Sequence, residues 1–126
     1  MTTANQVTRV RTIGIPVRDQ DKALDFYTNV LGLDKTLDVP TGSGHRWIEV
    51  SPPGGGTTIA LTAAKPGAAN SVETRIRLCV GDADAFRRHL LGNGARADEV
   101  LRWPGVPPMF AFRDQDGNRL EIVQES

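Results

Sequence analysis

Apolar and polar residues alternate in two stretches of the chain, one in each half. Apolar side chains recur at every second position in residues 13–17 and again in residues 76–80. A period of two is typical of a strand with one buried face. An aspartate follows each stretch after one further residue, Asp19 in the first half and Asp82 in the second. We therefore expect a strand to end in front of each aspartate.

A helix is predicted directly after each of these aspartates. Asp19 and Asp82 are suited to cap a helix, because an aspartate side chain accepts a hydrogen bond from a free backbone N–H group at the N-terminus. Apolar residues at helical spacing follow, namely Ala23, Phe26, Tyr27, Val30 and Leu31 in the first half and Phe86 and Leu90 in the second. Gly32, and either Gly92 or Gly94, are placed to end the helices in the left-handed conformation.

Three short extended segments, separated by Pro and Gly, follow each predicted helix. They cover residues 35–39, 45–51 and 57–62 in the first half, and residues 96–103, 109–113 and 118–124 in the second. The order of one strand, one helix and three strands therefore occurs twice, in modules of about residues 9–66 and 72–124 that residues 67–71 join. A module of this length buries little surface by itself. We expect the modules to pack against one another or against a second chain, within one domain that spans residues 1–126.

The overall composition narrows the class of protein. The 126 residues include 39% hydrophobic residues and have a formal net charge of zero, which favours one globular domain and argues against a nucleic-acid partner. Cys79 is the only cysteine, so an internal disulfide is excluded and a reducing compartment is favoured. The chain has no apolar run long enough to cross a membrane. We therefore predict a cytoplasmic protein without a membrane partner.

The doubled module and two short motifs resemble the vicinal oxygen chelate superfamily. The motif V-x-D precedes each predicted helix, and the motif D-x-D-G-N-x-L-E-I occupies residues 114–122. This superfamily includes glyoxalases, extradiol dioxygenases, fosfomycin-modifying enzymes and bleomycin-binding resistance proteins. The resemblance implies an α+β fold in which two βαβββ modules form a curved half-barrel sheet.

The metal-ligand positions of this superfamily are largely changed in this chain. The resemblance implies a histidine near the start of each module's first strand and a glutamate on its last strand. These positions fall on Thr12, Ala60, Arg75 and Glu121. An open metal site needs about three protein ligands, and the permanent positive charge of Arg75 would repel a cation. We therefore expect no metal cofactor at this site.

Glu121 is expected to form an ion pair instead. Its neighbours Leu120 and Ile122 should face the helices, which turns Glu121 into the concave cavity. Arg75 is expected to enter the same cavity and to form a bidentate pair with Glu121. A metal ion at Glu121 and a solvated carboxylate are the alternatives.

A shifted metal site is the alternative to a metal-free cavity. By alternation, His45, Trp47 and Glu49 share one face of a predicted strand. A set of His45, Glu49 and Glu121 could then hold a divalent metal ion if the strands meet. A half-exposed His45 at a loop mouth explains the same spacing without a metal.

The predicted concave faces have the composition of a small-molecule pocket, with aromatic walls and a few polar groups. The ligand-binding residues expected there are Thr12, Trp47, Ala60, Arg75, Arg77, Phe110 and Glu121. The arginines in this set favour an anionic ligand. Alternatively, the aromatic residues fill the barrel or a dimer interface.

These features predict a metal-independent protein of the glyoxalase and bleomycin resistance type that binds a small, anionic ligand. One alternative is a metal-dependent or metal-free lyase, isomerase or dioxygenase of the same superfamily, with Glu121 as the general base in the metal-free case. Another is an interaction module whose cavity is vestigial. The resemblance also implies a homodimer that completes its cavity across two chains.

Overall fold

The computed structural model describes residues 4–68 and 71–125 and confirms the doubled order of elements. The first module consists of β1 (Thr12–Val17), α1 (Gln20–Asp25), the π-helical turn η1 (Phe26–Val30), β2 (Asp34–Pro40), β3 (Arg46–Ser51) and β4 (Thr58–Ala63). The second module consists of β5 (Glu73–Val80), α2 (Ala83–Gly92), β6 (Leu101–Trp103), β7 (Val106–Arg113) and β8 (Arg119–Gln124). Part of the predicted joint, residues 69–70, lies outside the described residues.

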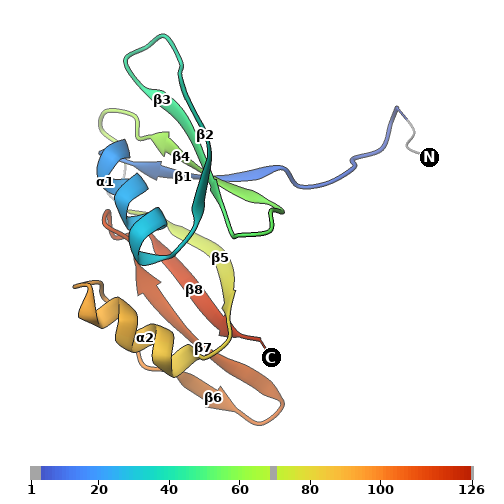
Figure 1. The fold of residues 1–126 in the computed structure, drawn as a ribbon, viewed down its shortest axis with the longest axis vertical. Coiled ribbons are helices and arrows are strands. Elements are labelled where there is room, and N and C mark those ends of the chain that lie inside the picture. The colour runs from blue at the N-terminus through green and yellow to red at the C-terminus, as the bar shows by residue number, and fades with distance from the viewer. Residues whose placement is uncertain (1–3, 69–70, 126) are drawn as a thin grey trace.

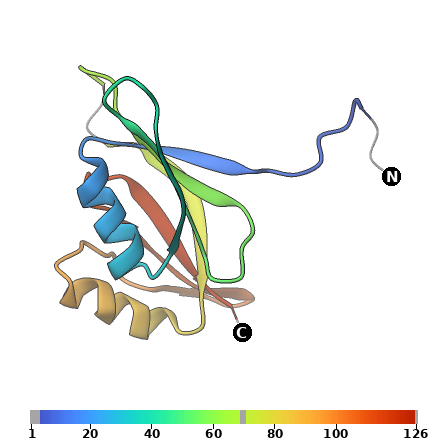
Figure 2. The same cartoon turned by 45° about the horizontal axis from the view of Figure 1, so that its top comes forward.

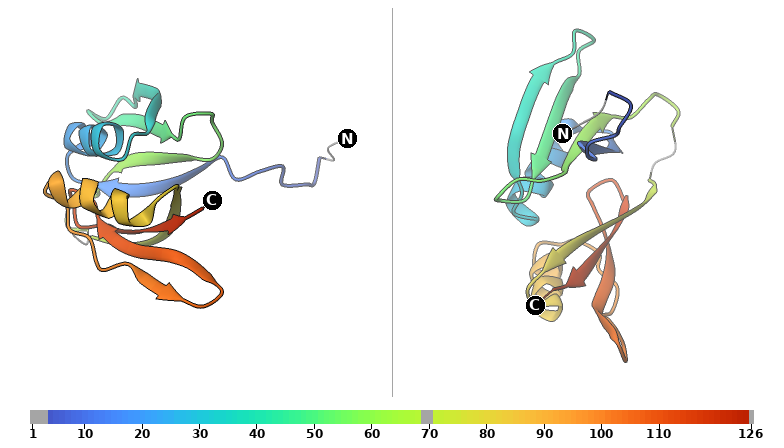
Figure 3. Two further views of the ribbon diagram at one scale, coloured as in Figure 1. Left: turned by 60° about the horizontal axis from the view of Figure 1, so that its bottom comes forward. Right: turned by 90° about the vertical axis from the view of Figure 1, so that its right-hand side faces the viewer.

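Each module forms one four-stranded mixed sheet. The strand order is β1-β4-β3-β2 in the first sheet and β5-β8-β7-β6 in the second. β1 runs parallel to β4 and β5 runs parallel to β8, whereas the other neighbouring strands are antiparallel. The right-hand view of Figure 3 shows the first module above the second. The predicted α+β fold with two βαβββ modules is therefore confirmed.

Both helices lie on the same side of the molecule, next to each other (Figures 1 and 2). The side chains of Asp19 and Asp82 cap them, each accepting a hydrogen bond from the backbone N–H three residues further on, at 3.1 and 3.0 Å. Gly32 and Gly94 have φ angles of 78° and 80°, so Gly94 takes the left-handed position in the second module. No helix within residues 4–68 and 71–125 is long and apolar enough to cross a membrane.

One cluster of buried apolar side chains runs through both modules. It joins the helix-facing side chains of β1, β3 and β4 to those of β7 and β8. The ring of Phe26 stacks on the ring of Phe112, with centroids 6.4 Å apart. Phe110 belongs to the same cluster and is 1% exposed, which corrects the prediction that it lines the ligand cavity. Alternation along β7 turns Phe110 and Phe112 toward the helices, whereas Met109 and Ala111 point to the other side of the sheet.

The turn between β7 and β8 fastens the second module to the first. Asp114 Oδ2 accepts a hydrogen bond from the Tyr27 hydroxyl at 2.8 Å, and Asn118 Nδ2 donates to Pro16 O at 3.0 Å. Burial raises the pKa of Tyr27 well above its usual value, and the Asp114 carboxylate adds to this effect. The phenol is therefore a protonated donor at neutral pH. The D-x-D-G-N motif thus joins the two modules through buried polar contacts.

Candidate functional site

Each sheet has one face toward the helices and one face away from them, which we call the open face. A row of directly paired residues crosses the first sheet, namely Gly14, Ala60, Glu49 and Leu37. Directly paired residues in a sheet point to the same side. The strand neighbours Ile48 and Ile59 belong to the buried core on the helix side. Glu49 and the rest of this row therefore lie on the open face.

Glu49 is the buried centre of this open face and is 3% exposed. Glu49 Oε1 accepts a hydrogen bond from Thr58 Oγ1 at 2.9 Å, and Oε2 accepts one from Trp47 Nε1 at 2.7 Å. Arg11 Nη2 approaches Oε2 to 3.4 Å from a side chain that is largely exposed. A buried carboxylate is stable only when such partners compensate for lost hydration.

These contacts keep the Glu49 side chain ionised. The hydrogen bond from Trp47 lowers the pKa of the Glu49 carboxyl, and Thr58 and Arg11 lower it further against the opposing effect of burial. Water screens the contribution of Arg11, because its guanidinium is exposed. At neutral pH Glu49 is therefore an anion that accepts hydrogen bonds and is a weak base.

A hollow of about 270 Å³ opens beside Glu49. The segment before β1, the strands β2 and β3 and the loop from β3 to β4 line it, and Arg9 and Arg11 both belong to its wall. Two guanidinium groups thus stand at a pocket of small-molecule size. Sequence reasoning missed Arg9 and Arg11 because they precede the first predicted strand. Their R-x-R spacing was the available signal, since alternate residues of an extended chain point to the same side.

Three of the predicted ligand-binding residues lie around Glu49. Trp47 is 38% exposed and is held at its edge by the hydrogen bond to Glu49. Thr12 is paired with Thr58 and donates its hydroxyl to Thr58 O at 3.3 Å. Ala60 is buried directly opposite Glu49. The structure therefore brings Thr12, Trp47 and Ala60 together on the first sheet.

Glu121 lies on the open face of the second sheet. Leu120 and Ile122 are buried in the core on the helix side, as alternation requires. Arg77 Nη2 lies 3.4 Å from Glu121 Oε1, and Arg119 Nη1 lies 4.0 Å from the same oxygen. Glu121 and Arg77 are thus predicted ligand residues that the structure brings together, on a different sheet from Trp47.

Arg77 is the partner of Glu121 in place of Arg75, which corrects the predicted ion pair. Along β5, the pairing with β8 changes from Glu73 opposite Arg119 to Arg77 opposite Glu121, so β5 contains a bulge. Arg75 lies in this bulge with a φ angle of 60° and an exposed side chain. The extra residues shift the register and bring Arg77 to the position that Arg75 was expected to occupy.

Comparison with known proteins agrees with this architecture. A sequence model of the Glyoxalase/Bleomycin resistance protein/Dioxygenase superfamily matches residues 9–122. The chain belongs to this superfamily. The match covers both βαβββ modules and both sheets described above.

Members of the superfamily and further relatives resemble the chain over nearly its full length. The uncharacterized protein YurT of Bacillus subtilis (strain 168) is 31% identical over 127 residues, which cover 93% of this chain and 99% of YurT. A superfamily member from Sphaerobacter thermophilus DSM 20745 has 32% identity and a TM-score of 0.86, over 94% of this chain and 98% of its own. TnmS3, an antibiotic binding protein from Streptomyces sp. CB03234, has 31% identity and a TM-score of 0.81, over 99% and 100%.

The residues present do not fit the divalent cation that catalytic members of the superfamily use. The four ligand positions that the resemblance implies hold Thr12, Ala60, Arg75 and Glu121. The shifted set of His45, Glu49 and Glu121 is not assembled either, because Glu49 lies on the first sheet and Glu121 on the second. Within residues 4–68 and 71–125, no three His, Cys, Asp or Glu side chains are grouped so that they could hold one metal ion.

Proposed function

We propose that the chain binds a small, planar and anionic molecule in the hollow of the first sheet, without a metal ion. The proposal rests on the buried Glu49 carboxylate, which lines the hollow together with Arg9 and Arg11 and accepts a hydrogen bond from Trp47, whose side chain stands outside the wall of the hollow. The exposed face of an indole binds flat rings by stacking, and guanidinium groups bind carboxylate or phosphate groups. TnmS3, at 31% identity, is an antibiotic binding protein, which supports a small-molecule ligand for this chain.

The carboxylates of the open faces favour binding over catalysis. Glu49 has a lowered pKa, with the hydrogen bond from Trp47 as the largest lowering contribution, so it is a poor general base at neutral pH. Glu121 is engaged by the guanidinium of Arg77 and lies near that of Arg119. Glu49 thus serves to position donors beside the hollow, and Glu121 forms an ion pair on the other sheet. Sequestration of the ligand is the proposed outcome.

Tryptophan fluorescence tests this proposal directly. The chain has two tryptophans, so the Trp103→Phe variant retains Trp47 as its reporter. We expect planar aromatic carboxylates that raise the melting temperature in a thermal-shift screen to quench the fluorescence of this variant, because their rings stack on Trp47. The Trp47→Phe variant should bind the same compounds about tenfold more weakly, since the smaller ring stacks over less area and lacks the N–H group that Glu49 anchors.

The charge of the hollow is tested by a matched pair of arginine variants. Arg11→Gln removes a guanidinium from the hollow, whereas Arg88→Gln removes an exposed one from α2. Arg11→Gln should weaken binding by about tenfold and Arg88→Gln should leave it unchanged, as measured by isothermal titration calorimetry. Equal affinities for the Trp47→Phe, Arg11→Gln and unmodified proteins would refute binding at this hollow.

We further propose that two copies of the chain associate through the hairpin of β6 and β7. Leu101 and Trp103 on β6 are 48% and 52% exposed, and Val106 on β7 is also exposed. Leu101 is paired with Met109, which points away from the helices, so Leu101 extends the open face of the second sheet, and the register shifts between this pair and the pair of Trp103 and Val106. Exposed apolar patches of this kind mark association surfaces, and a second copy supplies the matching patch by two-fold symmetry.

A further inference from the structure

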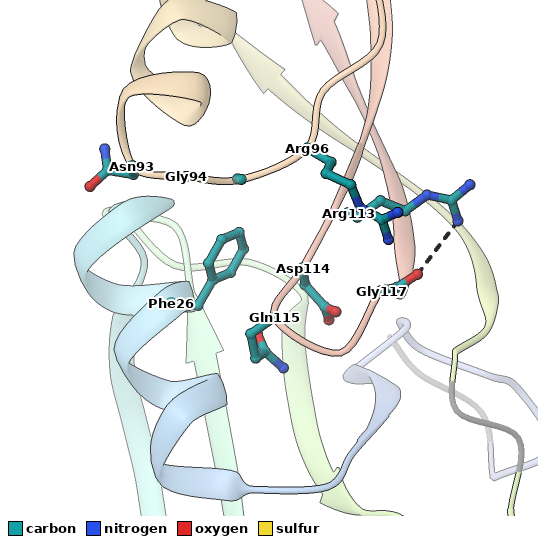
Figure 4. A pocket seen from close by; sticks show the side chains of 9 residues that line it. Phe26, Asn93, Gly94, Arg96, Arg113, Asp114, Gln115 and Gly117 are labelled. Carbon is teal, nitrogen blue, oxygen red and sulfur yellow. Dashed lines mark hydrogen bonds between the residues drawn. The ribbon is translucent and has the colours of Figure 1, made fainter.

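A second hollow, of about 320 Å³, lies at the junction of the two modules (Figure 4). Its wall includes Phe26 from η1, the segment that follows α2 and the turn between β7 and β8. It shares no lining residue with the hollow beside Glu49. We propose that this junction hollow binds a small molecule that carries an oxyanion next to a hydrogen-bond donor. The proposal is independent of the one made for the first sheet.

Two arginines supply the positive charge of the junction hollow. Arg96 and Arg113 both line it, and their guanidinium groups both reach Gly117. Arg113 Nη1 donates to Gly117 O at 3.5 Å, and a Cβ atom added at Gly117 would lie 3.7 Å from Arg96 Nη2. Two guanidinium groups near one backbone position repel each other, and an anion bound between them would offset this repulsion. They also match the geometry of a carboxylate or phosphate group.

The Asp114 carboxylate inside the junction hollow forms no salt bridge with these arginines among the described residues. Asp114 Oδ1 accepts hydrogen bonds from the backbone N–H groups of Asp116 and Asn118, both at 2.9 Å. Asp114 Oδ2 accepts from the Tyr27 hydroxyl at 2.8 Å and from Asn118 Nδ2 at 3.0 Å. The described part of the chain provides no salt bridge to Arg96 or Arg113. A bound oxyanion would give Arg96 and Arg113 a direct ion-pair partner.

Gln115, which also lines the junction hollow, is the reason why the ligand should carry a hydrogen-bond donor. Gln115 Oε1 is a buried acceptor that has no hydrogen-bond partner among the described residues. Its orientation is set by Gln115 Nε2, which donates to Asp116 Oδ2 at 3.2 Å. Exchanging the nitrogen and oxygen of the Gln115 amide would place Gln115 Oε1 against the acceptor Asp116 Oδ2. A hydroxyl or ammonium group on the ligand would satisfy Oε1, as buried polar atoms normally require.

These contacts define the ligand class as a hydroxy acid or amino acid, or a phosphate compound with a free hydroxyl. The ring of Phe26 gives the hollow one apolar wall, which suits a short carbon skeleton between the two polar groups. Because the wall comes from both modules, a bound ligand adds contacts across their junction. Binding should therefore raise the melting temperature of the folded chain.

Titration with simple probes tests the proposal. L-lactate carries a carboxylate and a hydroxyl, propionate lacks the hydroxyl, and inorganic phosphate represents the alternative oxyanion. We expect chemical-shift changes at the backbone amides of Gly94 and Gly117 in ¹H–¹⁵N spectra, with L-lactate binding at least about threefold more tightly than propionate. Tighter binding of phosphate than of L-lactate would assign the oxyanion as a phosphate group.

Arginine variants distinguish specific binding in the junction hollow from general attraction of anions to positive charge. Arg96→Gln should weaken L-lactate and phosphate binding by about tenfold, whereas the matched loss of charge in Arg88→Gln on α2 should change it less than about twofold. Arg113→Gln should show the same loss as Arg96→Gln, with an unchanged fold checked by the dispersion of the spectrum. Equal losses for Arg96→Gln and Arg88→Gln, or unchanged spectra with all three probes, would overturn the proposal. Trp47→Phe should leave these titrations unchanged, so the proposals for the hollow beside Glu49 and for the junction hollow are tested independently.

Discussion

Glu49 receives hydrogen bonds from Thr58 and Trp47 while it is almost fully buried. We predict that Glu49→Gln lowers the free energy of unfolding by about 1 kcal/mol at neutral pH, because the shape is kept but the charge-assisted bonds are lost. Urea denaturation measures this change. Glu99→Gln is the control, since it removes the same charge from an exposed side chain.

The difference in unfolding free energy between the unmodified chain and Glu49→Gln should depend on pH. The pKa of Glu49 is lowered in the folded state, first by the hydrogen bond from Trp47, relative to about 4.3 in an unfolded chain. Its stabilising contribution is therefore present above that value and is lost as the pH falls through the folded-state pKa. The difference between the unmodified chain and Glu49→Gln should shrink between about pH 5 and pH 3. An equal difference at both values would show that Glu49 is not ionised in the folded chain.

At the scale of single residues, the sequence predicted which side of the sheet a side chain faces better than it predicted which side chain it pairs with. Alternation around Ile122 correctly turned Glu121 away from the helices. It could not identify Arg77 as the partner, because the bulge at Arg75 changes the register of two strands that are distant in sequence. A positive φ angle at an arginine has no local signature of the kind that glycine provides. Long-range register therefore had to come from the structure.

Among the elements, the turn from β7 to β8 makes the polar contact that most directly joins the modules. Tyr27→Phe removes the donor to Asp114 Oδ2, and we expect it to lower the free energy of unfolding by about 1–2 kcal/mol. The pKa of Tyr27 is raised, mainly by burial. This stabilisation is therefore complete below about pH 10, the value for an unfolded tyrosine, and declines as the pH rises above it.

Absorbance gives a direct measurement of that ionisation. Tyr27 is the only tyrosine of the chain, so the phenolate band near 295 nm reports on this one side chain. The band should appear together with the loss of far-ultraviolet circular dichroism, because the buried phenol ionises when the chain unfolds. A phenolate band that appears at about pH 10 in a fully folded chain would contradict the buried hydrogen bond.

Element types were predictable because their signals are local. The capping aspartates Asp19 and Asp82 and the left-handed Gly32 and Gly94 lie where the sequence placed them. The predicted strand over residues 96–103 is shorter in the structure, where β6 covers Leu101–Trp103. The π-helical turn η1 was also missed, since an i to i+5 hydrogen bond leaves no distinct apolar pattern.

For the whole molecule, the open face of the second sheet predicts association of two chains. Leu101→Asp places a charge on the exposed apolar surface of β6, and we expect it to weaken the dimer by at least about tenfold. Sedimentation equilibrium measures this constant. Leu91→Asp is the matched control, because Leu91 is similarly exposed but lies on α2. A monomeric unmodified chain at micromolar concentration would contradict the proposed interface.

The indole of Trp47 is anchored through its N–H group to a carboxylate that is itself immobilised by Thr58. Rotation of this ring is therefore restricted before any guest molecule arrives. Binding of a flat ligand of the kind proposed above would then cost less side-chain entropy than binding to a freely rotating tryptophan. Selectivity among guests should consequently appear mainly in their residence times, because the encounter itself requires no rearrangement.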